Sequence, residues 1–546
     1  MAVKKLIKKY IFAIVFLYLI FCLAAGLFFS LERARAEEKE LQNVWVNQTE
    51  ILPEGQKFMS ILNQVHKDGL PRERYHTSTI TGLIIQKYST PLPDKKAIFL
   101  ETIDFLLTDA FVRYLSDLNR GVFDYQEMEK RKLDNDVIEE KLQLLKEGRK
   151  EGKIFEIIAD QRPRLQRYEL LKQRLEHYRL LARKKEWPAI KYNGSLQEGD
   201  RAKEVADVRQ RLMLEPGQER NLETDENNLF DEELKKAVEE FQQHWNLRET
   251  GLIDLQTVQA LNISPEQIIK KIKLNLDRLR WLSVDENSHY VLANIPEFRL
   301  YVIKEEEVEM EMKTVVGSSD RQTPIFSDNI EKLIFNPVWY IPQSIVFEEY
   351  LPEAKKDVAY LEENHIRVYE INNGQAEEVN PHNIDWDKLN KDNFDYLLWQ
   401  DSGHWNLLGN VIFRGTEYNP ESIYLHDTPE RHLFYQSRRA YSHGCVRLKE
   451  PLDLAFYLLN LDDDWDKDRL HNLISGNTET SIALEEPIPL YYAYLTAWID
   501  GEGRLNIEPD IYERDQKLME FWQESSLNSN KIDSLFWEEI SYKRIF

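Results

Sequence analysis

The N-terminal apolar run places the first constraint on how this chain can fold. Lys4, Lys5, Lys8 and Lys9 precede an uncharged and almost wholly apolar stretch from Tyr10 to Ser30. A stretch of this length is close to the ~20 residues that span a bilayer as a helix. Because lysines stay on the cytoplasmic side of such a helix, the pattern predicts a transmembrane anchor with the rest of the chain outside the cytoplasm.

A cleaved signal peptide is the alternative for this segment, which we place at residues 1–36. Ala34-Arg35-Ala36 fits the small-x-small pattern of a cleavage site. The apolar run exceeds the ~7–15 residues of a typical signal core, and this favours an uncleaved anchor. Both readings export the chain.

The exported part is long and acidic. The chain has 546 residues, enough for several domains of ~150 residues each. Its net charge of −24 argues against a polyanion such as nucleic acid as the main partner.

Helical spacing dominates residues 41–190. A helix with an aromatic face is expected from Thr102 to Leu118. Another helix is expected where apolar residues recur every three or four positions and so share one face, namely Leu165, Tyr168, Leu171, Leu175, Tyr178 and Leu181. We predict a helical scaffold domain here, without catalytic residues.

A compact apolar pattern follows in residues 195–265. It resembles the small three-helix peptidoglycan-binding module through Val205, Val208 and Leu212, then Leu234, Val238 and Phe241, then Gly251, Asp254, Thr257 and Leu261. The chain departs from that family's pattern in two ways: the acidic stretch Glu223 to Glu226 is inserted, and the family's Gly-Thr pairs are missing. Glycan binding and a purely supporting role therefore both remain open.

The hydrophobic period changes to two in residues 286–465, which predicts strands. The run Val308 to Val316 alternates as a half-buried strand, with Phe298 to Ile303 as its hairpin partner. The other expected elements are strands at Leu333–Tyr340, Val411–Phe413 and Ile423–His426 and a helix from Pro451 to Leu459. A polar insert at about 344–405 is expected to form a lid or subdomain, and residues 466–546 are expected to pack on this domain as a C-terminal extension.

These patterns predict an α+β multidomain protein. Its β-rich domain is expected to be mixed and β-sandwich-like, accompanied by the helical scaffold, the small module and the N-terminal helix.

One cysteine outside the N-terminal run requires a chemical explanation. The chain has two cysteines, and Cys22 lies inside the apolar run, so Cys445 has no evident disulfide partner. His443, His426 and Arg447 are close to it in sequence, and such groups favour the thiolate by lowering a pKa that starts near ~8.5. We therefore expect a reactive thiol, with a buried, inert cysteine as the alternative.

The sequence around this thiol resembles a known enzyme family. Ile423-Tyr424-Leu425-His426-Asp427-Thr428-Pro429, followed by Arg438 to Leu448 with Ser442-His443-Gly444-Cys445-Val446-Arg447, closely resembles the signature of the L,D-transpeptidases, which have a YkuD-type catalytic domain. Asn336 to Trp339, Leu408-Gly409-Asn410 and Glu486 to Pro489 are similar to the same family. With the anchor, scaffold and module, the chain resembles its large membrane-anchored Gram-negative members.

The resemblance implies a role for each signature residue. Cys445 would be the nucleophile and His426 the general base, oriented by the backbone carbonyl of Asp427. Backbone N–H groups at Gly444 and Cys445 would form the oxyanion hole, and Arg447 would hold a substrate carboxylate. The remaining implied residues are His443, in a secondary role, and the substrate-binding Tyr424, Trp339 and Ser442.

The implied reaction is acyl transfer between peptidoglycan stem peptides. The Cys445 thiolate attacks the bond between the third stem residue, diaminopimelate, and D-alanine. A second stem's diaminopimelate amine then resolves the thioester and forms a 3→3 cross-link of cell-wall biogenesis. The chemistry requires no metal or cofactor, and a carbapenem is expected to acylate the same thiol.

Three alternatives remain. Water in place of the amine would make the enzyme an L,D-carboxypeptidase. His426, His443 and Cys445 could instead form a metal site, although no fourth ligand is evident. The chain could also be a non-catalytic wall-binding scaffold protein.

The resemblance also implies partners and a location. Donor and acceptor stem peptides are the expected partners, and the N-terminal helix is expected to sit in the inner membrane as a single pass. The catalytic domain would then face the periplasm, as it would after signal cleavage.

Overall fold

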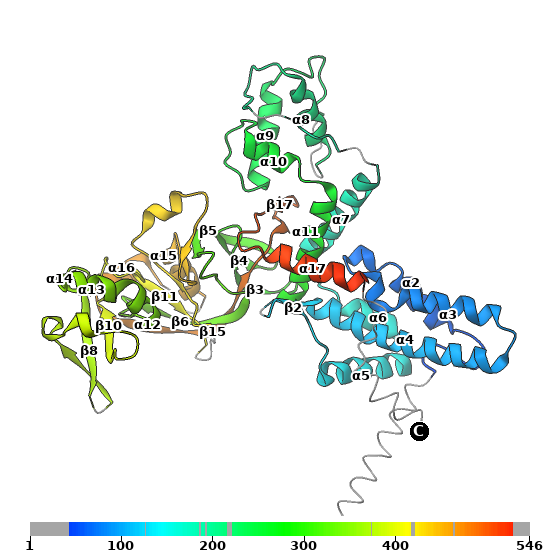
Figure 1. Ribbon diagram of the computed structural model, residues 1–546, viewed down its shortest axis with the longest axis horizontal. Coiled ribbons are helices and arrows are strands. Elements are labelled where there is room, and N and C mark those ends of the chain that lie inside the picture. Colours follow the sequence, from blue (N-terminus) through cyan, green and yellow to red (C-terminus); the bar gives the residue numbers. More distant parts are fainter. Residues whose placement is uncertain are drawn as a thin grey trace, which may run out of the picture. The chain divides into compact units, whose positions relative to one another are not determined.

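The computed structural model of the chain divides into two compact units (Figure 1). It describes residues 43–125, 127–184, 187–191, 194–215, 221–372, 374–416, 421–461 and 465–527. The anchor expected over residues 1–36, including Cys22, lies outside these ranges. Within the described ranges, no helix combines the length and the apolar character that crossing a bilayer requires.

The first unit, made of Met1–Val122, Arg131–Arg162 and Trp522–Phe546, is helical where it is described. Its elements are α2 (Pro53–Leu62), η1 (Val65–Asp68), η2 (Arg72–Tyr75), α3 (Thr77–Ser89), α4 (Pro93–Arg120), α5 (Asn135–Glu151) and α6 (Ile154–Asp160). The helix expected from Thr102 to Leu118 lies inside α4. A proline in the first turn starts α4, and Gly121 follows its end at a φ of 78°.

The second unit, Phe123–Lys130 with Pro163–Phe521, contains the helix whose face the spacing predicted. This helix, α7 (Gln166–Lys184), buries Tyr168, Leu171, Leu175, Tyr178 and Leu181. It packs against α11 (Pro265–Leu282), which a Ser264 capping box starts. The hydroxyl of Tyr168 accepts a 2.8 Å hydrogen bond from the buried Arg280 of α11. The unit also holds the short hairpin β1 (Phe123–Asp124) and β2 (Glu129–Lys130).

The expected small module forms three helices. They are α8 (Lys203–Met213), α9 (Glu232–His244) and α10 (Leu255–Leu261). Asp231 and Asp254 cap α9 and α10 by accepting backbone N–H groups at 2.9 and 2.8 Å. The buried Gln242 side chain donates to the Leu252 carbonyl at 2.7 Å and accepts from the N–H of Gly251 at 2.9 Å. This amide ties the loop before α10 to α9.

A strand ring forms the core of the β-rich domain. Its order is β5-β14-β12-β11-β6-β15-β3-β4, and a further pairing of β4 with β5 closes it, while β13 pairs with β5 outside the ring. The strands are β3 (His289–Asn294), β4 (Arg299–Lys304), β5 (Glu307–Gly317), β6 (Phe326–Phe335), β11 (Val411–Arg414), β12 (Leu425–His426), β13 (Ala440–Ser442), β14 (Val446–Leu448) and β15 (Thr480–Ala493). The expected β-rich domain with mixed strand directions is confirmed, and the β4–β5 pairing adds that its strand order closes into a ring.

The predicted hairpin supplies that closing pair. β4 and β5 pair antiparallel across a turn in which Glu305 and Glu306 have positive φ. β5 alternates only in its first half, and from Thr314 onward it is buried. The second half also pairs with β14 and β13, so both of its edges are covered.

The polar insert is a subdomain with its own core. Its sheet has the order β7-β10-β8-β9. The elements are β7 (Trp339–Tyr340), α12 (Gln343–Ile345), η3 (Val346–Tyr350), α13 (Leu351–Lys356), α14 (Ala359–Glu363), β8 (Ile366–Asn372), β9 (Gln375–Val379), η4 (Pro381–Asn383), η5 (Trp386–Lys388) and β10 (Tyr396–Gln400). Val346, Leu361, Val368 and Leu398 are buried in a hydrophobic cluster inside it.

The C-terminal part contributes to the ring itself. β15 pairs antiparallel with β6 and parallel with β3, and so lies between two strands of the domain. The remaining elements of the described chain, two of which precede the C-terminal part, are η6 (Arg431–Tyr435), α15 (Pro451–Leu459), α16 (Lys467–Ser475), β16 (Ala497–Ile499), β17 (Leu505–Ile507) and α17 (Arg514–Leu527). The bounds of α15 are those expected from the sequence.

The buried face of α7 generates a test of the fold. We expect Leu175→Ala to lower the free energy of unfolding by about 2–5 kcal/mol, because it leaves a cavity in a packed core. Leu180→Ala on the same helix is the control, since Leu180 is 49% exposed, and its effect should stay within about 0.5 kcal/mol. Urea denaturation of both variants measures the difference, and equal effects would contradict the assigned face.

Candidate active site

Two short parallel strands bring the signature residues together. β12 and β14 pair so that Leu425 faces Val446 and His426 faces Arg447. Leu425 and Val446 are fully buried, and alternation therefore turns His426 and Arg447 to the opposite face of the sheet. Cys445 directly precedes Val446, so it lies on the same face as His426, diagonally across the strand pair. The two halves of the signature form one site.

A tight turn presents the cysteine. Gly444 has a φ of 119°, and a Cβ there would lie 2.8 Å from Ile423 Cδ1, so the position requires glycine. Its carbonyl accepts from Thr323 Oγ1 at 2.7 Å. Ser442, expected to contact substrate, is buried instead. Its Oγ donates to the Cys445 carbonyl at 2.5 Å and accepts from the Gly444 N–H at 3.1 Å.

These contacts change the assignment of the oxyanion hole. The Gly444 N–H, which was expected to contribute, is occupied by Ser442 Oγ. The N–H of Cys445 has no acceptor among the residues that the structure describes. Cys445 is therefore the better candidate donor for a developing oxyanion.

The imidazole of His426 is buried and held by backbone carbonyls. Its Nδ1 lies 2.5 Å from the carbonyl oxygen of Asp427, the contact expected from the sequence. In the neutral ring, Nδ1 then carries the proton and Nε2 is the basic nitrogen. Burial, followed by the charge of Arg447, lowers the pKa of His426 to about 3, although the carbonyls of Asp427 and Leu408 favour the protonated form.

The pKa of the Cys445 thiol is shifted in the direction opposite to the expected one. Its Sγ lies 4.0 Å from the Ser422 carbonyl, and the residue is partly buried. Burial of the thiol raises its pKa to about 11, outweighing the Tyr424 N–H and the charges of Arg447 and Arg414, which lower it. The predicted thiolate is thus wrong for the resting site, because desolvation was not visible in the sequence. The resting pair is a neutral thiol and a neutral imidazole.

Arg447 is paired in this structure. Its guanidinium forms an ion pair with Glu430, whose side chain is 39% exposed. The Arg447 Nε is buried and has no partner among the described atoms. A carboxylate already occupies the group that was expected to hold one.

His443 faces the insert. Its Nε2 lies 2.8 Å from the Oε1 of Glu349 in η3, and Arg321 pairs with the adjacent Glu348. Among the described residues, no group of three or more His, Cys, Asp or Glu side chains could hold a metal ion.

The two aromatic residues expected to bind substrate differ in position. Trp339 is buried in the core of the insert, with its ring 6.1 Å from that of Tyr350, and this corrects its expected role. Tyr424 is partly buried, and its ring centre lies 6.0 Å from that of His426. Burial, and after it the nearby Cys445, raises the pKa of Tyr424, while Arg414 lies over its ring at 5.6 Å. Of these two aromatic residues, Tyr424 is the one that lies beside the catalytic imidazole.

Comparison with known families agrees with this geometry. Residues 288–465 match the family of the L,D-transpeptidase catalytic domain. The chain carries an L,D-transpeptidase catalytic domain. Residues 37–175 match the Scaffold domain family, and residues 201–261 match the family described as "Putative peptidoglycan binding domain".

A curated relative agrees with this assignment. A Haemophilus influenzae protein described as a "Putative L,D-transpeptidase" is 32% identical over 268 residues, which are 48% of this chain and 53% of that protein. The chain thus spans about half the length of this curated relative.

Two solved structures are similar only locally. The L,D-transpeptidase from Mycobacterium smegmatis is 14% identical at a TM-score of 0.17, covering 37% of this chain and 57% of that one. The L,D-transpeptidase from Xylanimonas cellulosilytica is 11% identical at 0.18, covering 55% and 98%. Scores this low do not establish a shared fold.

Several residues of the L,D-transpeptidase domain's site were not predicted. Glu430, Glu349 and Arg414 contact or polarise the signature residues, and the Leu408 carbonyl faces the imidazole. Leu408 belongs to a segment already noted as similar to the family. The three charged residues carry no sequence signal, because their partners are set by the tertiary fold.

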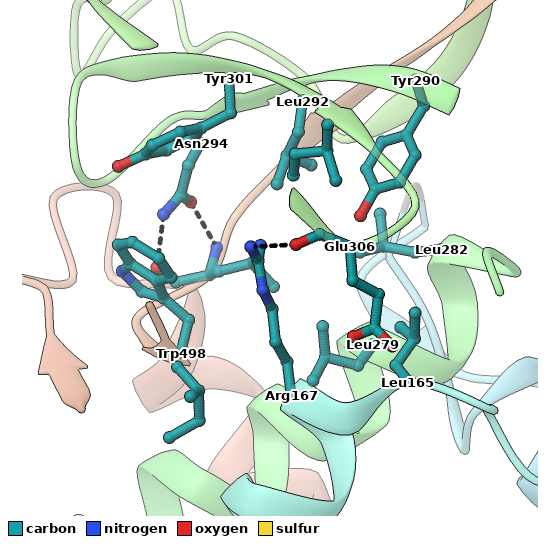
Figure 2. Close-up of a pocket in the computed structure, with 13 residues that line it drawn as sticks. Leu165, Arg167, Leu279, Leu282, Tyr290, Leu292, Asn294, Tyr301, Glu306 and Trp498 are labelled. Carbon is teal, nitrogen blue, oxygen red and sulfur yellow. Dashed lines mark hydrogen bonds between the residues drawn. The ribbon is translucent and has the colours of Figure 1, made fainter. Parts of the chain in front are cut away.

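A pocket elsewhere in the second unit does not contain the signature residues. It lies between α7 and α11 and the strands β3, β4 and β16 (Figure 2). Leu279, Leu282 and Leu292 line it, and the Arg167 guanidinium crosses it to donate to the Glu306 carbonyl at 2.7 Å. The cavity volume of about 40 Å³ suits about three water molecules. It is too small for a stem peptide.

The neutral pair generates a pH prediction. A thiol with a pKa raised to about 11 is protonated below that pH. The rate of Cys445 alkylation by iodoacetamide should therefore rise about tenfold per pH unit from pH 6 to pH 10. Intact-protein mass spectrometry over time measures this alkylation rate. Cys445→Ala is the blank, and a free thiol, whose alkylation rate levels off near pH ~8.5, is the reference. A rate that levels off below pH 8 would show a stabilised thiolate instead.

Proposed function

We propose that the chain is a peptidoglycan L,D-transpeptidase that makes 3→3 cross-links, with Cys445 as nucleophile and His426 as general base and acid. The observation that carries this is the β12–β14 register, which sets the thiol and an oriented, neutral imidazole on one face. The peptidoglycan-binding-type module at residues 201–261 supports the same substrate class.

The proposed first step couples attack with proton transfer. Because both groups are neutral at rest, the thiol proton moves to His426 Nε2 as the sulfur attacks the carbonyl between diaminopimelate and D-alanine. The imidazolium that forms is stabilised by the carbonyls of Asp427 and Leu408, which favour the protonated ring. The Cys445 N–H is placed to donate to the oxyanion, a contribution of roughly 3 kcal/mol for one donor.

The proposed second half transfers the acyl group. His426 returns its proton to the D-alanine nitrogen as the C–N bond breaks, leaving a thioester on Cys445. The acceptor's amine attacks this thioester and gives a proton back through His426, so that the thiol is regenerated. Arg447 would bind a substrate carboxylate after Glu430 releases it.

The location follows from the same proposal. An N-terminal anchor in the inner membrane would hold the catalytic domain in the periplasm, where its stem-peptide substrates lie. The acidic net charge of −24 is compatible with a substrate that is not a polyanion.

Acylation by a carbapenem tests the nucleophile. We expect the folded protein to gain the mass of one drug molecule, because the β-lactam carbonyl presents the same electrophile as the stem. Cys445→Ala should remain unmodified, and Cys22→Ala should be acylated like the wild type. Intact-protein mass spectrometry reads all three, and an unmodified wild type would contradict the proposal.

Whether an amine or water accepts the acyl group requires a separate measurement, because a transpeptidase and a carboxypeptidase form the same acyl-enzyme. We expect purified protein and disaccharide-tetrapeptide to yield tetra-tri dimers, resolved by chromatography with mass detection. Cys445→Ser is the control and should yield no product, since an alcohol is a weaker nucleophile than a thiol at this pH. Free tripeptide without dimers would assign hydrolysis instead.

A further inference from the structure

The side chain of Asp427 makes more hydrogen bonds than its expected role requires, because that role belongs to the backbone carbonyl of the residue. It is 1% exposed, and its two carboxylate oxygens accept four hydrogen bonds. Oδ2 accepts from the N–H of Asn410 at 2.8 Å and from its Nδ2 at 3.0 Å. Oδ1 accepts from the Thr428 N–H at 2.7 Å and from Arg431 Nη2 at 2.5 Å. The carboxylate therefore joins three separate pieces of backbone.

The first piece carries a carbonyl that faces the catalytic ring. Leu408 lies two residues before Asn410, and its carbonyl is near enough to the His426 imidazole to favour the protonated ring. Between them Gly409 has a φ of 62°, and a Cβ there would lie 2.4 Å from the Asp427 carboxyl carbon. The segment can approach this closely only because residue 409 is glycine.

The second piece carries the other carbonyl. Asp427 itself supplies the oxygen that Nδ1 of His426 contacts at 2.5 Å. The bond from Thr428 to Oδ1 fixes the peptide unit to which this carbonyl belongs, and the Asp427 N–H donates to the Val411 carbonyl at 3.0 Å. One side chain therefore anchors both segments whose carbonyls favour the protonated imidazole.

The third piece leads to the strand of the nucleophile. Arg431 bonds Asp427 and also donates from Nη1 to the Lys449 carbonyl at 2.7 Å. Lys449 directly follows β14, which begins one residue after Cys445. The chain of bonds thus runs from the imidazole cradle to the end of the cysteine's strand.

We propose that the Asp427 carboxylate is a positioning residue for His426, which assembles the two backbone carbonyls that cradle the imidazole and, through Arg431, ties this cradle to β14. The proposal rests on the function proposed above, in which His426 is the base. Asparagine cannot replace the carboxylate, because it offers one acceptor oxygen and turns an NH₂ toward donors on one side.

Loss of the Asp427 carboxylate is expected to loosen the His426 imidazole and to expose it to water. The titratable and charged groups around the ring are Arg447, which faces His426 across the strand pair, Tyr424, two residues before His426, and Cys445, which directly precedes β14. Burial is the main cause of the low His426 pKa of about 3. Release of the ring also removes the two carbonyls, which favour the protonated form, but burial is the larger effect, so the pKa of His426 should rise toward its ordinary ~6.5.

The test compares Asp427→Asn with wild type by two readouts. Histidine labelled with ¹³C at Cε1 reports the His426 titration without substrate, with His426→Gln identifying the signal. The pH profile of kcat/KM for dimer formation reports the base. We expect the variant's acidic limb to move from below pH 4 to between pH 5 and 6.5, with a loss at pH 5 of about twofold at the lower end of that range and about thirtyfold at the upper end, from ring protonation alone.

Two further variants keep the result interpretable. Arg431→Gln, at a side chain that is 45% exposed, should fold readily and show a smaller shift in the same direction. Asp328→Asn is the matched control, because Asp328 also accepts a backbone N–H, that of Thr416 at 3.1 Å, without contacting the imidazole. It should leave the His426 titration unchanged.

The outcomes separate this inference from the function. An unmoved His426 titration in both Asp427→Asn and Arg431→Gln would overturn the positioning role, even if activity falls with stability. A wild type without cross-linking or carbapenem acylation would overturn the proposed function, while the titration would still report on the cradle.

Discussion

The parallel pairing of β12 with β14 is the constraint on which the whole site depends. A slip of one residue in either strand would turn its side chains to the other face and separate His426 from Cys445. The fully buried Leu425 and Val446 oppose such a slip, because it would exchange them with polar neighbours. The register is therefore set by the hydrophobic core, and the chemistry depends on residues that take no part in it.

Burial then determines the protonation states of the pair. The same enclosure that raises the Cys445 pKa to about 11 lowers that of His426 to about 3, so neither group is charged at neutral pH. Arg447 acts on both, favouring the thiolate and opposing the imidazolium. A neutral imidazole can serve as a base at neutral pH, so this arrangement delays charge separation until an electrophile is present.

Local patterns predicted the elements better than the environment of the site. The face of α7 and the β4–β5 hairpin could be read from periodicity, because each depends on residues near one another in sequence. The signature likewise located Cys445 and His426. The direction of the thiol's pKa shift and the burial of Ser442 and Trp339 could not be read, since desolvation depends on distant segments. The pairing of His443 with Glu349 required the fold of the insert.

The pairing of Arg447 with Glu430 agrees with a role for Arg447 in binding a carboxylate. An isolated buried guanidinium would be costly, and the acidic side chain of Glu430 lowers that cost. Because Glu430 is 39% exposed, solvent screens its side of the pair. A substrate carboxylate that brings further contacts could therefore replace Glu430 at little cost, and Glu430 could then turn to solvent. The pair thus keeps Arg447 oriented on the face that it shares with His426.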